Sequence, residues 1–294
     1  MEQIETCEIC GKNSFSKYLD SQDYFLTQEK FTIVKCNNCQ FLFVNPRPTE
    51  TEIRKYYQSK EYISHSNSKK GLINQIYQFV RKRNNIKKFN LIQKYKQFGT
   101  ILDIGCATGE FLNYFKKNGW KVVGLEPNEH ARNFAKTKYG LNIFPERFLY
   151  EKHKEKFDVI TMWHVLEHIH FLSQRIEQVK NNLRQGGVLI IAVPNVESKD
   201  SKIYGKFWAG YDLPRHIYHF TQSSIKELFK KFGFDIIETV PMKSDSYYIS
   251  MLSEYYIRGK RSFIRTLLNG FLSNQWAKRN NNNFSSLIFV LKKH

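Results

Sequence analysis

Strand-length apolar runs alternate with helix-spaced apolar positions along the second two thirds of the chain. Residues 100–104, 121–125, 157–162 and 188–193 are mostly apolar, as is typical of strands buried on both faces of a parallel sheet. Between them apolar residues recur every three, four or seven positions, most clearly over 166–183, which predicts helices. This alternation predicts an α/β fold with a doubly wound sheet.

The remaining sequence completes the predicted sheet and adds flanking regions. A helix is expected at 223–232, with strands at 234–240 and 286–291. We therefore expect three regions, which are a small zinc-binding module at 1–48, a helical basic connector at 49–98, and a catalytic domain at 99–294 with an insertion at 243–284.

Composition supports a folded protein, and the placement of charge narrows its partners. Hydrophobic residues make up 41% of the chain, no apolar run approaches the length of a membrane span, and the first residues are polar, so we expect a soluble cytoplasmic protein. The net charge of +19 is concentrated in residues 69–98 and 255–294, which contain no Asp or Glu. These stretches fit either solvated helix faces or contact with a polyanion or an anionic membrane.

Four of the five cysteines form two tight pairs near the start of the chain. Two residues separate Cys7 from Cys10, and two separate Cys36 from Cys39. In a reducing compartment such pairs indicate a metal site rather than disulfides. Together they can form a closed tetrahedral cage for structural zinc, which would stabilise so short a segment.

A turn with two glycines follows the first apolar run of the α/β region. Residues 102–109 read Leu-Asp-Ile-Gly-Cys-Ala-Thr-Gly, and glycines suit a tight strand-to-helix turn whose backbone approaches a ligand. Glu126 lies 23 residues after Asp103, at the end of the next strand, where its carboxylate can accept hydrogen bonds from both hydroxyls of a ribose. The Gly-x-Gly-x-x-Gly spacing expected of an NAD dehydrogenase is missing.

Residues 102–112, 124–127, 157–168 and 186–195 resemble, in order and spacing, the motifs of class I S-adenosylmethionine-dependent methyltransferases. The resemblance implies a Rossmann-like seven-stranded sheet, behind a zinc-ribbon-like module in this chain, and S-adenosylmethionine as cofactor. By position, Asp103 and Gly105 would line the methionine end of the cofactor. The other implied contacts are Cys106, Ala107 and Gly109 in the turn, Glu126 at the ribose, Pro127 and Asn128 at the adenosine, Phe148 over the adenine, and Trp163 and His164 beside the sulfonium. Ala107 departs from the family, because many members have glycine there.

The loop at 208–221 contains aromatic residues and two histidines beyond the fifth strand. It is similar to the loop of bacterial sugar methyltransferases, including zinc-bearing C-methyltransferases of deoxysugar pathways, which carry a Glu-His pair there. Arg215-His216 replaces that pair, and the lost carboxylate weakens the case for C-methylation of a keto sugar.

Histidine suits the base that methyl transfer to a hydroxyl or an enolisable carbon requires. We expect His216 to be this base, with His219 as second candidate and Tyr211 or Asp212 contacting the acceptor. His168 is expected in the helix after the fourth strand, in an orienting role. The alternative is that the loop histidines bond to backbone and only fix the loop.

The sequence therefore predicts a small-molecule methyltransferase, acting on a sugar or another intermediate of polysaccharide or natural-product assembly. A sugar nucleotide or a lipid-linked compound would be the acceptor. One alternative is an RNA methyltransferase that uses the basic segments as a clamp, although these lack interleaved aromatic residues. Another is a non-catalytic protein that keeps the fold as an interaction platform.

Residues 255–276 carry one further expectation. Ile264, Leu267, Leu268, Phe271 and Leu272 share one face of a predicted helix, with basic residues before them. Such a helix lies on a membrane surface or packs in a core or a dimer. The sequence fixes neither the oligomeric state nor the atom that is methylated.

Overall fold

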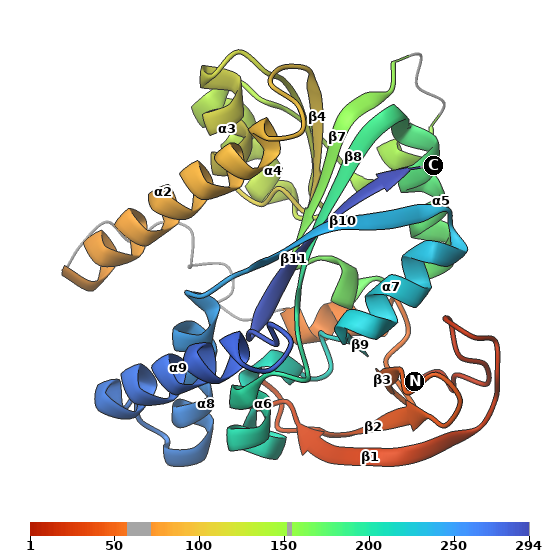
Figure 1. Ribbon diagram of the computed structural model, residues 1–294, viewed down its shortest axis with the longest axis vertical. Helices are drawn as coiled ribbons and strands as arrows, with labels where there is room; N and C mark the ends of the chain where they lie inside the picture. Colours follow the sequence, from red (N-terminus) through yellow and green to blue (C-terminus); the bar gives the residue numbers. More distant parts are fainter. Residues whose placement is uncertain (58–71, 152–154, 294) are drawn as a thin grey trace. The chain divides into compact units, whose positions relative to one another are not determined.

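The computed structural model describes residues 1–57, 72–151 and 155–293, with side chains outside 72–82. Lys69 and Lys70 of the basic stretch lie outside the described residues. The chain forms two compact units (Figure 1). Unit 1 comprises Met1–Gln58, His164–Arg175 and Ile191–Val290, and unit 2 comprises Ser59–Trp163, Ile176–Ile190 and Leu291–His294. This division differs from the expected boundaries at residues 48 and 98, because each unit is assembled from separate stretches of chain.

Strands and helices follow one another through the chain. The strands are β1 Phe15–Gln22, β2 Lys30–Cys36, β3 Leu42–Val44, β4 Thr100–Ile104, β5 Lys121–Leu125, β6 Asn142–Phe144, β7 Phe157–Trp163, β8 Leu183–Pro194, β9 Tyr218–His219, β10 Phe234–Pro241 and β11 Ser286–Lys293. The α-helices are α2 Leu72–Gln93, α3 Glu110–Lys117, α4 Glu129–Tyr139, α5 Leu172–Asn182, α6 Lys199–Tyr204, α7 Gln222–Lys231, α8 Asp245–Arg258 and α9 Phe263–Lys278. Short 3-10 turns are η1 Glu52–Tyr57, η2 Glu146–Tyr150, η3 Leu166–His168, η4 Gly205–Phe207 and η5 Ala209–Tyr211.

Seven strands form one sheet in the order β10-β11-β8-β7-β4-β5-β6. β4 pairs in parallel with both β5 and β7, and β5 pairs in parallel with β6. The strand order reverses at β4, so the carboxyl ends of β4 and β7 form the switch point at which open α/β sheets bind ligands. The predicted α/β fold with a seven-stranded Rossmann-like sheet is confirmed.

The helix expected over 166–183 is shorter than its apolar spacing suggested. α5 begins only at Leu172, and the 3-10 turn η3 precedes it. The N–H of Ile217 donates to the carbonyl of Glu167 at 2.9 Å, so this carbonyl bonds to the aromatic loop before α5 begins. His168 therefore lies in η3, and its predicted place in the helix is wrong.

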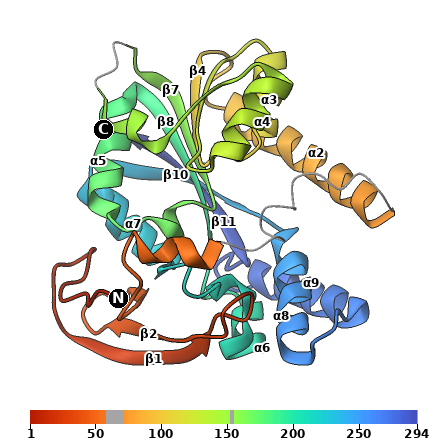
Figure 2. The same cartoon turned by 180° about the vertical axis from the view of Figure 1, so that it is seen from behind.

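The N-terminal residues of unit 1 contribute to a second sheet, in the order β1-β2-β3-β9 (Figure 1). Figure 2 shows its long strands β1 and β2 from behind. Its last strand comes from the aromatic loop, since Leu42 pairs with His219 and Phe43 with Tyr218. The core beneath this sheet is shared in the same way, with Ile33 and Val44 of the module packed in one cluster with Trp208 of the loop. The cysteine-bearing module and the loop are thus one structure.

The insertion before the last strand folds into two packed helices, α8 and α9, which lie beside α6 in unit 1 (Figure 1). Within the described residues, no helix has both the length and the apolar character needed to cross a membrane.

Candidate functional site

The glycine turn connects β4 to α3 in unit 2, at the switch point of the sheet. Gly105 and Gly109 both have φ of 76°, a left-handed conformation that favours glycine. A Cβ at Gly109 would lie 2.6 Å from Leu141 Cδ1, so glycine is also needed there for space. Ala107 has φ of 47°. The residue that departs from the family pattern is therefore held in a conformation that costs a non-glycine residue about 1–2 kcal/mol.

Glu126 ties the turn to the end of β5. Its Oε2 accepts a hydrogen bond from the Ala107 N–H at 2.9 Å, and its Oε1 accepts one from the Asn128 N–H at 2.9 Å. Burial raises the pKa of Glu126, while these two N–H donors act in the opposite direction. Asn128 in turn caps α4 by accepting a bond from the Ala131 N–H. The carboxylate is thus fixed where the resemblance implies a ribose.

Asp103 is the second-last residue of β4 and is only 2% exposed. Its Oδ1 accepts a hydrogen bond from Thr161 Oγ1 at 2.6 Å. Burial raises the pKa of Asp103 to about 7, although the Thr161 bond and the Lys88 ammonium lower it, and Glu126 adds to the rise. Cys106 is buried too, and burial followed by the charges of Asp103 and Glu126 raises the pKa of its thiol. This thiol is suited to packing rather than to attack on a substrate.

Trp163 is the last residue of β7. Its ring packs edge-to-face with the ring of Phe111, with the two centroids 5.6 Å apart. Lys88 Nζ lies 3.9 Å from the centroid of the Trp163 ring. Its Nε1 is buried and has no hydrogen-bond partner among the described residues, which is unusual for a tryptophan. Sequence reasoning missed Lys88, because a lysine in a basic helix gives no sign of which aromatic ring it covers.

Phe148 lies in η2, which follows β6. Its ring stacks on Phe144 at 4.4 Å, and it also lines a surface cavity with the first residues of three parallel strands, Thr100, Lys121 and Phe157. Phe144 ends β6 beside Glu126, whose N–H donates to the Phe144 carbonyl. The position of Phe148 over an adenine stays a prediction.

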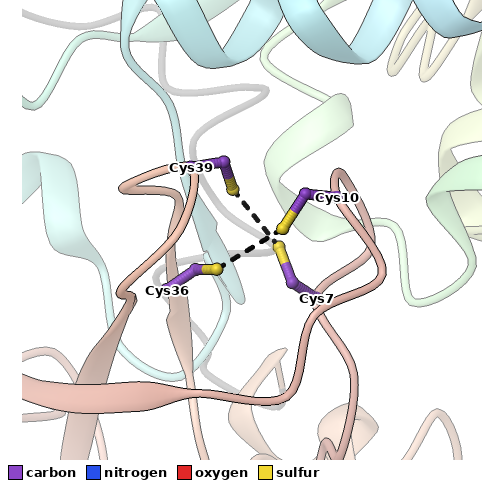
Figure 3. Close-up of side chains that lie close together, drawn as sticks. All are labelled: Cys7, Cys10, Cys36 and Cys39. Atoms are coloured by element: carbon purple, nitrogen blue, oxygen red, sulfur yellow. Dashed lines mark hydrogen bonds between the residues drawn. The ribbon is translucent and has the colours of Figure 1, made fainter.

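The four N-terminal cysteines gather at one point in unit 1, as Figure 3 shows. Cys7 Sγ lies 3.5 Å from Cys39 Sγ, and Cys10 Sγ lies 3.6 Å from Cys36 Sγ. All four sulfurs lie within 4.8 Å of one another. A tetrahedral zinc with bonds of about 2.3 Å would hold its sulfurs about 3.8 Å apart, so the cluster has the donors and the size for this ion.

A second cluster surrounds the carboxylate of Glu167 in unit 1. Its Oε1 lies 3.4 Å from His164 Nδ1 and 4.0 Å from His216 Nε2, while the ring of His168 lies 4.7 Å from that of His216. Neither oxygen of Glu167 makes a hydrogen bond within the described part of the chain, although the residue is 1% exposed. Burial acts to raise the pKa of Glu167, but the three histidines outweigh it and lower this pKa.

A backbone carbonyl fixes the tautomer of His216. Its Nδ1 lies 2.9 Å from the Gly210 carbonyl, and because a carbonyl only accepts, Nδ1 carries the proton and Nε2 keeps a lone pair. His168 Nδ1 lies 2.9 Å from both the Arg215 carbonyl and the Tyr57 hydroxyl. Burial, followed by the charge of His216, lowers the pKa of His168 to about 4.

His164 is different, because it lies between two acids. Its Nε2 is 3.3 Å from Asp245 Oδ2, on the far side of the ring from Glu167. Burial acts to lower the pKa of His164, but the carboxylates of Asp245 and Glu167 outweigh burial and raise it to about 9. Its φ of 55° places it in the left-handed region, the kind of strain that collects at functional sites. Although the sequence suggested a cofactor contact, the structure also makes His164 a cation in this cluster.

Arg215 anchors the loop instead of facing the histidines. Its Nη2 donates to Asp23 Oδ1 at 3.1 Å and to Asp212 Oδ1 at 2.7 Å, and its Nη1 donates to the Tyr56 carbonyl. Both oxygens of Asp212 bind Arg215, so this carboxylate is largely occupied within the loop. Arg215 therefore joins the loop to the N-terminal module.

Tyr211 and His219 are buried beside one another, with ring centroids 5.2 Å apart. Burial, followed by the charge of His216, lowers the pKa of His219 to about 3, and burial raises the pKa of Tyr211. His219 belongs to β9 and is therefore fixed by strand pairing with Leu42. Both residues are more enclosed than His216, and their predicted roles as acceptor contact and second base stay predictions.

Comparison with known proteins identifies the family. A model described as a methyltransferase domain matches residues 74–239, more than half of the chain. The chain belongs to the methyltransferase domain family. The match spans β4 to β10 and therefore includes the glycine turn, Glu126 and the Glu167 cluster.

Curated relatives are similar over part of their length. The chain is 31% identical over 114 residues to an uncharacterized methyltransferase of Alkaliphilus oremlandii, covering 38% of this chain and 52% of that protein. It is 30% identical over 142 residues to a ubiquinone biosynthesis O-methyltransferase of Pelagibacter ubique, covering 45% and 58%. A tRNA U34 carboxymethyltransferase of Pseudoalteromonas atlantica is 28% identical over 110 residues, covering 35% and 34%. The chain thus spans about half the length of the first two.

Among solved structures, the fold is similar to that of magnesium protoporphyrin IX methyltransferase (ChlM) from Synechocystis PCC 6803 with bound SAH. The TM-score is 0.55 at 14% sequence identity, over 84% of this chain and all of that one. At this identity the likeness concerns the fold alone.

Proposed function

We propose that this protein transfers a methyl group from S-adenosylmethionine to a small-molecule acceptor. The observation that carries the proposal is the double anchoring of Glu126, whose carboxylate is fixed by N–H donors from two loops at the switch point of the sheet. When bound there, the cofactor supplies an electrophilic methyl group on a sulfonium.

The residues around the turn fit this cofactor. Asp103 is a buried carboxylate available to the methionine ammonium, and Glu126 is positioned for the ribose hydroxyls. The unpartnered Nε1 of Trp163 offers a donor near the same strand ends. Gly105, Cys106, Ala107 and Gly109 would contribute backbone, Pro127 and Asn128 would border the adenosine, and His164 would follow Trp163 at the end of β7.

His216 is the residue we propose to remove the acceptor proton. Its Nδ1–H is held by the Gly210 carbonyl, which leaves the Nε2 lone pair free. Glu167 Oε1 and Asp212 Oδ2 lie 4.0 Å and 3.9 Å from Nε2, so the imidazolium formed on proton uptake would be stabilised. His219 remains the second candidate, with Tyr211 as an acceptor contact. The acceptor would carry a hydroxyl or an enolisable carbon, as sugars and intermediates of polysaccharide or natural-product assembly do.

We also propose that Cys7, Cys10, Cys36 and Cys39 hold a structural zinc ion. Four thiolate donors close the coordination shell and leave no position for a substrate. The ion would fix the module that supports the aromatic loop through β3 and Asp23, and would thereby shape the acceptor site.

RNA is the second candidate acceptor. The relative named as a tRNA U34 carboxymethyltransferase favours it, as does the basic stretch over 83–98. An RNA clamp predicts binding that weakens steeply between about 50 and 200 mM salt. Filter binding of tRNA across this range tests this alternative.

The decisive experiment has two stages. Calorimetry with S-adenosylmethionine and its demethylated product tests the cofactor, and a panel of sugar nucleotides and phenolic acceptors then tests turnover. His216→Ala should lower kcat at least 100-fold and leave cofactor affinity unchanged, whereas His130→Ala, on the exposed side of α4, should alter neither. An absence of cofactor binding would contradict the proposed methyltransferase function. Full turnover by His216→Ala would contradict the role of His216 as the base.

A further inference from the structure

α9 presents its apolar side to solvent. Six large apolar side chains on this helix are between 44% and 82% exposed. They form adjacent pairs that recur every four residues, which puts them on one continuous stripe along the helix. They are Phe263, Ile264, Leu267, Leu268, Phe271 and Leu272.

The opposite side of α9 is polar and faces the protein. Ser273 Oγ donates to Asp200 Oδ1 at 2.6 Å, and Asn274 Nδ2 donates to the Lys243 carbonyl at 2.9 Å. A Cβ at Gly270 would lie 2.5 Å from the Tyr247 ring, so α8 and α9 approach closely there. Rotating α9 to bury its apolar stripe would break these buried polar contacts. The outward orientation of the stripe is therefore fixed by the fold.

Basic residues surround the start of this stripe. The turn between the helices and its flanks expose four of them, Arg258, Lys260, Arg261 and Arg265. From residue 245 to 279 the acids are Asp245, which contacts His164, and Glu254, which is 3% exposed and pairs with Arg258. The exposed side of the α8–α9 hairpin thus combines an apolar stripe with the positive charge of Lys260, Arg261 and Arg265, which pair with no acid on the hairpin.

We propose that the α8–α9 hairpin binds the surface of an anionic lipid bilayer. The stripe would enter the boundary between headgroups and acyl chains, and the four basic residues would contact anionic headgroups. A helix of 16 residues is about 24 Å long, shorter than the hydrocarbon core of about 30 Å, so it lies in the interface and does not span. Tyr255, 47% exposed near the end of α8, suits the same interface.

The charge of this face favours an anionic bilayer over a second copy of this chain as the partner that covers the stripe. Each copy carries a net charge of +19, with basic residues at this face, so two copies repel where a bilayer with anionic lipids attracts. The proposal does not rest on the methyl-transfer reaction, because surface binding needs neither cofactor nor acceptor.

Vesicle flotation of the full-length protein tests the proposal. Vesicles with about 30% phosphatidylglycerol in phosphatidylcholine should bind the protein at least tenfold better than phosphatidylcholine alone. Leu267→Glu with Phe271→Glu should reduce binding at least tenfold, and Arg261→Gln about fivefold. Phe98→Glu is the matched control, because Phe98 is 72% exposed in unit 2 and should leave binding unchanged.

Circular dichroism of each variant, followed through thermal unfolding, separates lost binding from lost folding. Equal binding to both vesicle types, or unchanged binding by the Leu267/Phe271 variant, overturns the proposal. So does a stable dimer in sedimentation that the same two substitutions dissociate, since the stripe would then be covered by a second copy.

Discussion

The guanidinium of Arg215 donates a hydrogen bond to the carboxylate of Asp23, 192 residues earlier in the chain. Both side chains are at most 2% exposed. This pair joins the loop that contains His216 to the cysteine-bearing module. Arg215 thus holds the loop in place from its buried side.

Arg215→Ala should therefore destabilise the protein strongly. Removing one partner leaves Asp23 buried without its counter-charge, which costs about 3–5 kcal/mol. The free energy of unfolding in urea measures this loss. Lys17→Ala removes a salt bridge to Asp20 on the exposed side of the same module and should change stability little. Equal effects of the two substitutions would contradict the anchoring role of Arg215.

Metal analysis tests the cysteine cluster. We expect one zinc ion per chain, lost on chelation together with a fall in Tm. Cys36→Ser should abolish zinc binding, because Cys36 is buried and its sulfur lies within the cluster. Cys106→Ser, in the glycine turn, should retain the full zinc content. A metal-free protein with the same Tm as the untreated one would argue against a structural ion.

Asp103 should make stability depend on pH. Its folded pKa of about 7 lies above the ordinary aspartate value of 3.8, so the folded state binds the extra proton and this contribution to stability is lost as the pH rises from about 4 through 7. Asp103→Asn lacks this loss and can still accept the Thr161 bond. Its stability relative to wild type should improve by about 3 kcal/mol between pH 5 and pH 8.

Urea unfolding of both proteins at these two pH values measures the difference. Other groups titrate in both proteins and largely cancel, although Lys88 and Glu126 also act on Asp103. A difference independent of pH would show that Asp103 is already ionised at pH 5.

Glu126→Gln should weaken cofactor binding. Each oxygen of the carboxylate accepts a hydrogen bond from one backbone N–H group. Glutamine keeps one oxygen that can accept, but its amide nitrogen can only donate, so one of the two bonds is lost. We expect Kd for S-adenosylmethionine to rise tenfold or more, as for a lost hydrogen bond to a charged group. Glu129→Gln, at the exposed start of α4, serves as the control. Unchanged affinity in the Glu126 variant would show that the ribose binds elsewhere.

The strands of the large sheet were predictable because burial on both faces demands continuous apolar runs, as at 157–162 and 188–193. The glycine turn was predictable because few sequences satisfy its backbone conformation. The structure that follows the end of β7 was not predictable in this way. Leu166 and Ile169 fit a helix in sequence, but the Glu167 carbonyl bonds to Ile217, a long-range contact that no local pattern encodes.

The candidate acceptor site was predicted less completely than the turn. His216 was singled out as a histidine in an aromatic loop, whereas no pattern in the sequence singled out Glu167. Only the fold brings Glu167 between His164 and His216. The same limit applies to α9, where the apolar spacing predicted a stripe but could not tell whether the stripe faced the protein or the solvent.

The pairing of β9 with β3 has a consequence for how such proteins can be recombined. A loop that supplies the edge strand of another module's sheet cannot be transplanted by itself. Its strand register and the packing of its buried aromatic rings depend on both the loop and that module. Chimeras that exchange acceptor specificity between relatives must carry the first 48 residues along with the loop.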